Sequence, residues 1–333
     1  MNFRATDGDR IQLKRIDIII VNYNSTHYLL KCLDSIHHHL KKEIKADIHV
    51  IDNASAENAD IVKKVFPGVM VHKNRTNVGF ARAVNQCMAE TVAPYILILN
   101  PDTLVGQGFF DSMLGFMSEN PHVAVAGPRI MEANGMVQGS ARAFPTPLTA
   151  LFGRNTMFSR LFPDNPVTAR NVLTECGNVK NARSVDWVSG ACMLVRRRAV
   201  CEVGMLDDGF FMYWEDADWC KRMSMKGWRI AYFPEAFIVH HVGGSCGNGD
   251  IRPLMAFHKS AYRYFCKHSP YGDNGFIKTL VFGSLSLRFC AMLAGRHLFK
   301  RRGKSCALPG SITDSGIIRS EHVVDEAFGN AGK

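Results

Sequence analysis

Two adjacent carboxylates, Glu215 and Asp216, are the side chains of this sequence best suited to acid–base chemistry. They follow directly on the aromatic run FFMYW at 210–214. Carboxylates beside apolar rings are costly to desolvate unless they are paired, hydrated or used in a reaction. The alternative is that one of them only caps the helix predicted to run to about Lys226, where an acid also suits the helix dipole. These residues alone leave both interpretations open.

Three further polar side chains stand where apolar runs end. They are Asn22 after residues 16–21, Asp52 after 47–51 and Asp102 after 95–99. Such runs are typical of strands covered on both faces of a parallel sheet. Because the carboxyl ends of parallel strands meet at the edge where open α/β sheets bind ligands, we expect these side chains to share one crevice. Turn chemistry explains any one of them alone.

The strands that must position these groups alternate with helical patterns. Apolar runs at 16–21, 47–51, 69–72 and 95–99 are separated by three helical patterns. The first pattern begins near Thr26, the second ends near Phe66 and the third begins near Phe80. This alternation predicts an α/β fold with a right-handed βαβ sheet. Between Gly127 and Asp186 the sequence is rich in proline, and we expect an irregular stretch there.

Composition narrows the class of protein. The chain has 333 residues, of which 47% are hydrophobic and 21% charged, enough for one large domain with an appendage. A net charge of +10 favours an anionic partner such as nucleotide-sugar phosphates, a membrane surface or nucleic acid. Its ten cysteines show no CxxC pair, which favours buried thiols in a reducing compartment. The amino-terminal residues lack an apolar core, so we expect no secretory signal and a cytoplasmic protein.

Several function classes lack their motifs. No GxGxxG follows the first strand and no GxxxxGK is present, which disfavours a dinucleotide oxidoreductase and a P-loop enzyme. A nucleotidyltransferase would carry a glycine-rich basic loop where this chain has Asn-Tyr-Asn-Ser. The aromatic residues fall mostly in apolar segments, so nucleic acid is not expected as a partner.

Seven motifs in residues 15–246 together resemble family 2 glycosyltransferases with a GT-A fold, in particular their rhamnosyltransferase-like bacterial branch. They are IDIIIVNYNS, VIDNAS, NVGFARAVNQ, ILILNPDT, VSGACMLVRR, FFMYWEDADWCKRM and VHHVGGS. Each is weak alone, but their order and spacing are specific. The resemblance implies a GT-A-like, nucleotide-binding Rossmann-type mixed sheet flanked by helices over residues 15–250.

The resemblance also implies a donor site and a metal. Asp52 would contact the nucleoside of a nucleoside diphosphate sugar, and Asn100-Pro101-Asp102 stands where many relatives carry Asp-x-Asp. Asp102 and His240 would hold a divalent cation, Mg²⁺ or Mn²⁺. The donor-binding residues implied are Asn22, Tyr23, Asp52, Asn53, Gly79, Phe80, Asn85, Asn100 and Asp102. For Gly79 the alternative is an ordinary turn before a helix.

The same resemblance makes Asp216 the general base, with Glu215 as its competitor, in a direct displacement that inverts the anomeric centre. Trp187, Gly190 and Ala191 would form a wall of the sugar and acceptor pocket. Arg142 could meet an acceptor diphosphate, although an exposed basic loop explains it equally well. Asp218 and Arg222 are expected to form an ion pair at a spacing of four. Asp207 and Asp208 stand in a turn, and Gln138 stands in the loop that could meet the acceptor diphosphate.

The carboxyl-terminal part is expected to form a helical, basic extension at 251–305 and a polar, mobile tail at 306–333. Residues 276–295 are long enough to cross a bilayer but contain Lys278 and Arg288, and basic residues follow. This favours a helix lying on an anionic membrane, and packing against the catalytic domain is the alternative.

The function predicted is an inverting, metal-dependent glycosyltransferase at the inner face of the cell membrane. It would move a sugar to a hydroxyl of a cell-envelope glycan or lipid-linked saccharide. The preferred donor would be dTDP-rhamnose, which supplies L-rhamnose. A UDP- or GDP-sugar donor is the alternative within the family. A catalytically inactive binding module and a nucleotidyltransferase are alternatives of other classes, and the oligomeric state is left open.

Overall fold

The computed structural model describes residues 15–145, 181–241 and 251–303, with side chains as far as residue 295. The chain divides into two units, Met1–Ser245 and Cys246–Lys333. The tail predicted at 306–333 and most of the stretch predicted to be irregular lie outside the described residues.

Within the described residues, the first unit is built on a ten-stranded sheet of order β3-β2-β1-β4-β11-β6-β12-β5, with β7 beside β6 and β9 beside β12. The strands are β1 Arg15–Asn22, β2 Lys45–Asp52, β3 Met70–Lys73, β4 Tyr95–Leu99, β5 Thr103–Val105, β6 Val123–Glu132, β7 Val137–Gln138, β9 Arg183–Val185, β11 Cys192–Arg196 and β12 Arg229–His240. Two short strands, β8 Ala141–Arg142 and β10 Trp187–Val188, pair separately.

The sheet is mixed, as predicted. β3, β2, β1 and β4 are parallel, whereas β11 runs antiparallel to both β4 and β6. β12 is parallel to β6 and antiparallel to β5. The reversed strand β11 brings its beginning to the edge where β1, β2 and β4 end, so polar groups from distant parts of the chain meet there.

The prediction of an irregular stretch from Gly127 to Asp186 is wrong for the part that the structure describes. β6 continues to Glu132, and β7 and β8 follow. Pro128 is tolerated in β6 because its pairing with β12 shifts register between Phe233 and Phe237, and proline in sheets is confined to edges and such irregularities.

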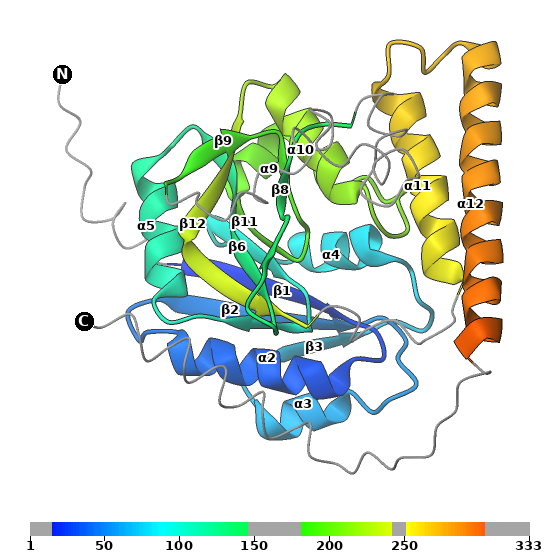
Figure 1. The fold of residues 1–333 in the computed structure, drawn as a ribbon. Helices are drawn as coiled ribbons and strands as arrows, with labels where there is room; N and C mark the ends of the chain where they lie inside the picture. Colours follow the sequence, from blue (N-terminus) through cyan, green and yellow to red (C-terminus); the bar gives the residue numbers. More distant parts are fainter. Residues whose placement is uncertain (1–14, 146–180, 242–250, 304–333) are drawn as a thin grey trace, which may run out of the picture. The chain divides into compact units, whose positions relative to one another are not determined.

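Helices cover both faces of the sheet (Figure 1). One face carries α2 Thr26–His39, α3 Asp60–Val65 and α5 Phe109–Glu119, and the other carries α4 Phe80–Met88, α9 Arg197–Val203 and α10 Glu215–Met225. Alternate residues of β1 divide between the two layers: Ile18 and Ile20 pack with the α2 side, and Ile19 with the α4 side. The continuous apolar strand therefore reflects burial on both faces.

The described part of the second unit, residues 251–303, contains the helices α11 Arg252–His268 and α12 Gly275–Gly303. They contact each other through edge-to-face ring pairs, His258 with Phe289 and Tyr262 with Phe282, each with centroids 5.6 Å apart. Among the described residues, α12 is long and apolar enough to cross a membrane over Gly275–Gly295, by length and composition, and none of that window is buried.

Candidate active site

Asn22 and Asp52 lie side by side at the carboxyl ends of β1 and β2. They are paired in register, and Asn22 Nδ2 donates a hydrogen bond to Asp52 Oδ1 at 3.0 Å. The same amide also donates to Ser55 Oγ at 3.2 Å. Both side chains are buried, so this contact presets the direction of the Asp52 carboxylate. Tyr23, the next residue along, is half-buried at this edge.

Asn53 organises the loop between β3 and α4. Its Nδ2 donates to Asn77 Oδ1 at 2.9 Å and to the Gly79 carbonyl at 3.2 Å. Its Oδ1 accepts from Asn74 Nδ2 and from the Val78 N–H, both at 3.1 Å. Because all of these bonds are made within the chain, Asn53 acts on the predicted donor site by fixing its walls.

Gly79 is needed where the loop enters α4. Its φ of +88° is rare for residues with a Cβ, and a Cβ there would lie 2.5 Å from the Phe211 carbonyl oxygen. The neighbouring Phe80 N–H donates to that same oxygen at 2.7 Å. The close approach is therefore to the chain just before the acidic helix α10, and it ties α4 to that segment.

Asp102 and His240 meet across β5 and β12. His240 pairs in register with Thr103, and its Nε2 lies 3.1 Å from Asp102 Oδ1. The other ring nitrogen, Nδ1, lies 3.1 Å from Gln138 Oε1. Amide and carboxylate oxygens both only accept, so Gln138 suits a proton on Nδ1, and a cation between Nε2 and Asp102 would take the place of the Nε2 proton in that contact.

This pair fits a divalent cation. Two ligands at right angles, each with a bond of about 2.1 Å, stand about 3 Å apart around an octahedral ion. The Asp102 oxygen and the His240 nitrogen have that separation. Gln138 supplies the outer hydrogen bond that orients a metal-binding imidazole. The sequence placed Gln138 in a loop near an acceptor; its contact with His240 spans 102 residues and has no local signal.

Asn100 and Ala191 connect the Asp102–His240 pair to the acidic helix. The Asn100 N–H donates to the Ala191 carbonyl at 2.9 Å, across the ends of β4 and β11. The Gly190 N–H, one residue earlier, donates to Asp216 Oδ2 at 2.9 Å. A Cβ at Gly190 would meet Asp216 only at ordinary contact distance, so the backbone donor matters more than the small size.

Glu215 and Asp216 begin α10 in different surroundings. Asp216 is half-buried, and its Oδ1 accepts from the Ala217 N–H at 2.8 Å in addition to the Gly190 bond. Glu215 is buried, and its Oε2 has no hydrogen-bond partner among the described residues. The two carboxylates are adjacent in sequence, but only Asp216 is both solvated and well supplied with donors.

Electrostatics separates the two acids. Burial and, after it, the neighbouring Asp216 charge together raise the pKa of Glu215 to about 8. Burial also raises the pKa of Asp216, but the Gly190 and Ala217 N–H groups and the Arg142 charge oppose that rise. Glu215 therefore holds its proton more firmly, and Asp216 is the stronger acid of the pair.

Arg142 and Trp187 lie opposite each other in the small β8–β10 pair. The Arg142 guanidinium stands 5.2 Å from the Trp187 ring centroid, and its Nε donates to the Gly139 carbonyl at 3.0 Å. Trp187 Nε1 donates to the Ala143 carbonyl at 2.9 Å. Arg142 is half-buried, not part of an exposed loop, and its charge acts on Asp216.

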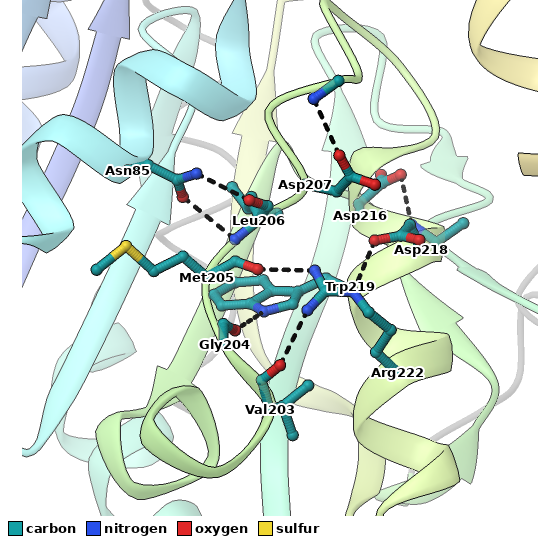
Figure 2. Close-up of polar contacts among 12 residues, drawn as sticks. Asn85, Val203, Gly204, Met205, Leu206, Asp207, Asp216, Asp218, Trp219 and Arg222 are labelled. Atoms are coloured by element: carbon teal, nitrogen blue, oxygen red, sulfur yellow. Dashed lines mark hydrogen bonds and ion pairs between the residues drawn. The ribbon is translucent and has the colours of Figure 1, made fainter. Parts of the chain in front are cut away.

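A set of bonds holds the chain before α10 in place (Figure 2). Arg222 pairs with Asp218 at 2.8 Å, which confirms the predicted ion pair, and it also donates to the carbonyls of Val203 and Met205. The Asn85 amide donates to the Leu206 carbonyl and accepts from its N–H. Asn85 was expected to support the donor site; its side chain engages this segment instead.

The turn that leads into α10 is strained. Tyr213 and Trp214 have φ of 69° and 71°, in the left-handed region that non-glycine residues rarely adopt. Such residues cost about 1–3 kcal/mol each and persist only where the surroundings hold them. The bond from Phe80 to Phe211 and the Arg222 contacts provide that hold on either side.

Comparison with known proteins identifies the family. The sequence profile of "Glycosyl transferase family 2" matches residues 17–201, more than half of the chain. This protein belongs to glycosyltransferase family 2. The family 2 glycosyltransferase is 31% identical over 304 residues to the N-acetylglucosaminyl-diphospho-decaprenol L-rhamnosyltransferase of Mycobacterium tuberculosis H37Rv, covering 87% of this chain and 96% of the relative.

A second relative of this family 2 enzyme is rhamnosyltransferase WbbL of Escherichia coli K12, 25% identical over 75% of this chain and 92% of the relative. Among solved structures, GalNAc-T7 with UDP, GalNAc and Mn²⁺ superposes with a TM-score of 0.53 at 15% identity, covering 82% of this chain and 54% of that one. This structural likeness confirms the GT-A-like fold.

Proposed function

We propose that this family 2 glycosyltransferase transfers L-rhamnose from dTDP-rhamnose to a sugar hydroxyl of an N-acetylglucosaminyl-diphospho-polyprenol, with inversion at the anomeric carbon. The observation that carries the proposal is the position of Asp216. It is bonded to Gly190 at 2.9 Å, one residue from the Ala191 carbonyl that receives the Asn100 N–H. The base is thereby linked through short contacts to the loop that bears Asp102.

Asp216 acts as the general base. It gives up its proton before Glu215 does, and its two backbone donors fix the carboxylate without adding a mobile positive group. The acceptor hydroxyl gives its proton to Asp216 as the oxygen attacks the anomeric carbon and the nucleoside diphosphate leaves from the opposite face. Glu215, protonated and buried, keeps a second negative charge away from Asp216. This chemistry inverts the configuration in one step.

Asp102 and His240 would hold Mg²⁺ or Mn²⁺. When bound, such an ion neutralises the charge that grows on the departing diphosphate. Gln138 Oε1, an acceptor 3.1 Å from His240 Nδ1, would hold the ring with Nε2 toward the ion. Asn22 orients the Asp52 carboxylate, which can accept hydrogen bonds from the N–H of a base or from ribose hydroxyls.

The substrate assignment rests on the relatives. Two rhamnosyltransferases match most of this chain, and the one at 31% identity acts on a decaprenol-linked acceptor by its name. The Arg142 guanidinium beside Trp187 offers a cation and an aromatic face next to Asp216, a combination suited to an acceptor that carries both diphosphate and sugar. A UDP- or GDP-sugar would use the same machinery.

The test is a donor and acceptor panel. Purified protein is incubated with dTDP-rhamnose, UDP-sugars and GDP-sugars, a short-chain GlcNAc-diphospho-lipid, and Mn²⁺, Mg²⁺ or a chelator. We expect release of dTDP with a rhamnosylated lipid of inverted configuration, and its loss with the chelator or with Asp102→Ala. An inactive binding module would bind a donor and release nothing. A nucleotidyltransferase would instead form diphosphate from a nucleoside triphosphate and a sugar phosphate.

We also propose that α12 lies on the inner face of the cytoplasmic membrane, where a lipid-linked acceptor is found. Exposed apolar side chains line it, and basic residues follow at 296–302. The exposed set is Phe276, Leu280, Phe282, Leu287 and Met292. Phe289 is turned toward α11, so the apolar face predicted from the sequence is partly used inside the second unit.

Vesicle sedimentation tests this placement. Wild-type protein is expected to sediment with anionic vesicles and less with neutral ones, since both apolar burial and positive charge contribute. Leu280→Glu with Leu287→Glu should remain in solution, whereas Thr279→Glu serves as a control that adds a charge without removing an apolar group. Equal sedimentation of the double variant and wild type would contradict the proposal.

A further inference from the structure

Three metal-binding side chains that the reaction does not use converge on the α4 face of the sheet. They come from β2, β3 and α4: His49, His72 and Cys87. One ligand atom from each lies within 4.8 Å of the other two. His49 and Cys87 are buried and His72 is half-buried. We propose that these three residues form a Zn²⁺ site, separate from the Asp102–His240 pair.

The separation of the two imidazoles is long for a hydrogen bond and fits a shared metal ion. His49 Nδ1 and His72 Nε2 lie 3.4 Å apart. Nitrogen donors and acceptors usually stand about 2.9–3.0 Å apart when they share a proton. Two Zn–N bonds of about 2.0–2.1 Å at the tetrahedral angle place the nitrogens about 3.3 Å apart. The two nitrogens already have about that separation, and the ring planes are 20° apart.

The third ligand sets the choice of metal. A Zn–S bond of about 2.3 Å places sulfur about 3.5 Å from each nitrogen, so the Cys87 thiol needs to move by little more than about 1 Å. Two imidazoles and a thiolate suit Zn²⁺, whereas the hard ions Mg²⁺ and Mn²⁺ prefer oxygen ligands. On binding, the Cys87 proton leaves to solvent and water takes the fourth position.

The surroundings are acidic, which suits a cation. Glu90 Oε2 lies 3.8 Å from His72 Nδ1, the ring nitrogen on the side away from His49. At this distance the carboxylate makes no hydrogen bond to the ring, but its charge favours a cation bound at the other nitrogen. The charges of Asp17 and Asp47 also act on His49, although Arg197 already pairs with Asp17.

Such an ion would join β2, β3 and α4, which border the loop from Asn74 to Gly79. Asn74 follows β3, and its amide donates to Asn53 and to Gln86, the residue before Cys87. The ion would therefore stabilise this part of the fold without touching the reacting groups. Its loss is expected to lower stability while leaving the rate of transfer at 25 °C within about twofold.

Co²⁺ substitution gives a readout that the catalytic pair cannot produce. A thiolate bound to Co²⁺ shows a charge-transfer absorption in the near ultraviolet, and Asp102 and His240 contain no sulfur. We expect this band at one equivalent of Co²⁺ in the wild type and in Asp102→Ala, and its displacement by Zn²⁺. Cys87→Ser should abolish it, while Cys201→Ser, which changes an exposed thiol, should keep it.

Thermal unfolding gives the second readout, carried out in the Asp102→Ala background so that the catalytic pair does not contribute. Zn²⁺ at about 100 times its Kd should raise the Tm by about 5–10 °C. His72→Gln should remove that shift, and His122→Gln, at an exposed histidine, should retain it. Absence of the band in the wild type, or a band that survives Cys87→Ser, would overturn the proposal whatever the transferase assay shows.

Discussion

Two regions of the same sheet edge are stabilised in opposite ways. Along the asparagine-rich edge, Asn22, Asp52 and Asn53 are held by hydrogen bonds within the chain, and of their buried side-chain atoms Asn22 Oδ1 alone is without a partner among the described residues. The acidic turn, Tyr213–Asp216, combines two residues with positive φ, two adjacent carboxylates and a buried oxygen of Glu215 that has no partner. The first region is largely satisfied by bonds within the chain, whereas the second is held at a greater cost.

The difference indicates where binding and chemistry reside. A satisfied hydrogen-bond network fixes the shape of a pocket and adds stability. Strain and unbalanced charge lower stability, and they are typical of groups that must react. Gly79 joins the two regions, because its carbonyl accepts a hydrogen bond from Asn53 and its Cα lies against Phe211.

The largest effect is expected from the acidic turn. Asp216→Asn should lower kcat by about 10²- to 10⁴-fold, since it removes the proton acceptor, and should leave the Kd of the nucleotide sugar unchanged. Steady-state transfer and calorimetric binding measure the two quantities. Asp208→Asn, an exposed acid paired with Arg82, is the matched control and should stay active. Full activity of Asp216→Asn with an inactive Glu215→Gln would move the base to Glu215.

The connection between the regions is tested next. Gly79→Ala should lower the free energy of unfolding by at least about 3 kcal/mol, because it adds both backbone strain and a clash with the Phe211 carbonyl. Gly227→Ala has nearly the same φ, +85°, with open space around its Cβ, and should cost about 1–2 kcal/mol. Urea unfolding gives both values. Equal losses would show that the contact with Phe211 contributes nothing.

The asparagine-rich edge should respond in stability. Asn53→Ala removes four hydrogen bonds made by a buried side chain, and we expect a loss of about 2–3 kcal/mol in urea unfolding. Asn134→Ala removes an asparagine from an exposed turn and should change stability by less than about 0.5 kcal/mol. If the two variants behaved alike, the edge would not be the preset region described above.

The smallest effect concerns the pH dependence of stability. The native Glu215 keeps its proton up to a pKa of about 8, whereas the unfolded chain releases it near the ordinary value of 4.5. Stability contributed by this group is therefore lost as pH rises from about 4.5 to about 8. The free energy of unfolding of Glu215→Gln should rise relative to that of the wild type by at least about 1 kcal/mol as the pH goes from 5 to 8. A difference independent of pH would contradict a protonated Glu215.

Much of the fold was predictable because its signals are local. Apolar strands followed by Asn22, Asp52 and Asp102 indicate a sheet with polar groups at one edge, and a spacing of four predicts the Asp218–Arg222 pair. The short strands β7, β8 and β9 were missed, since two or three residues carry no periodicity and their pairing is with distant segments.

Residue types and spacing by themselves determined the α/β class, the family and the positions where carboxylates follow strands. Tertiary structure alone decided which of these groups have partners. Gln138 reaches His240, Asn85 reaches Leu206, and Gly190 reaches Asp216 across 26 to 121 residues. The burial and hydrogen bonds that separate the pKa of Glu215 from that of Asp216 depend on this folding, because neighbours in sequence differ in environment only once the chain around them is packed.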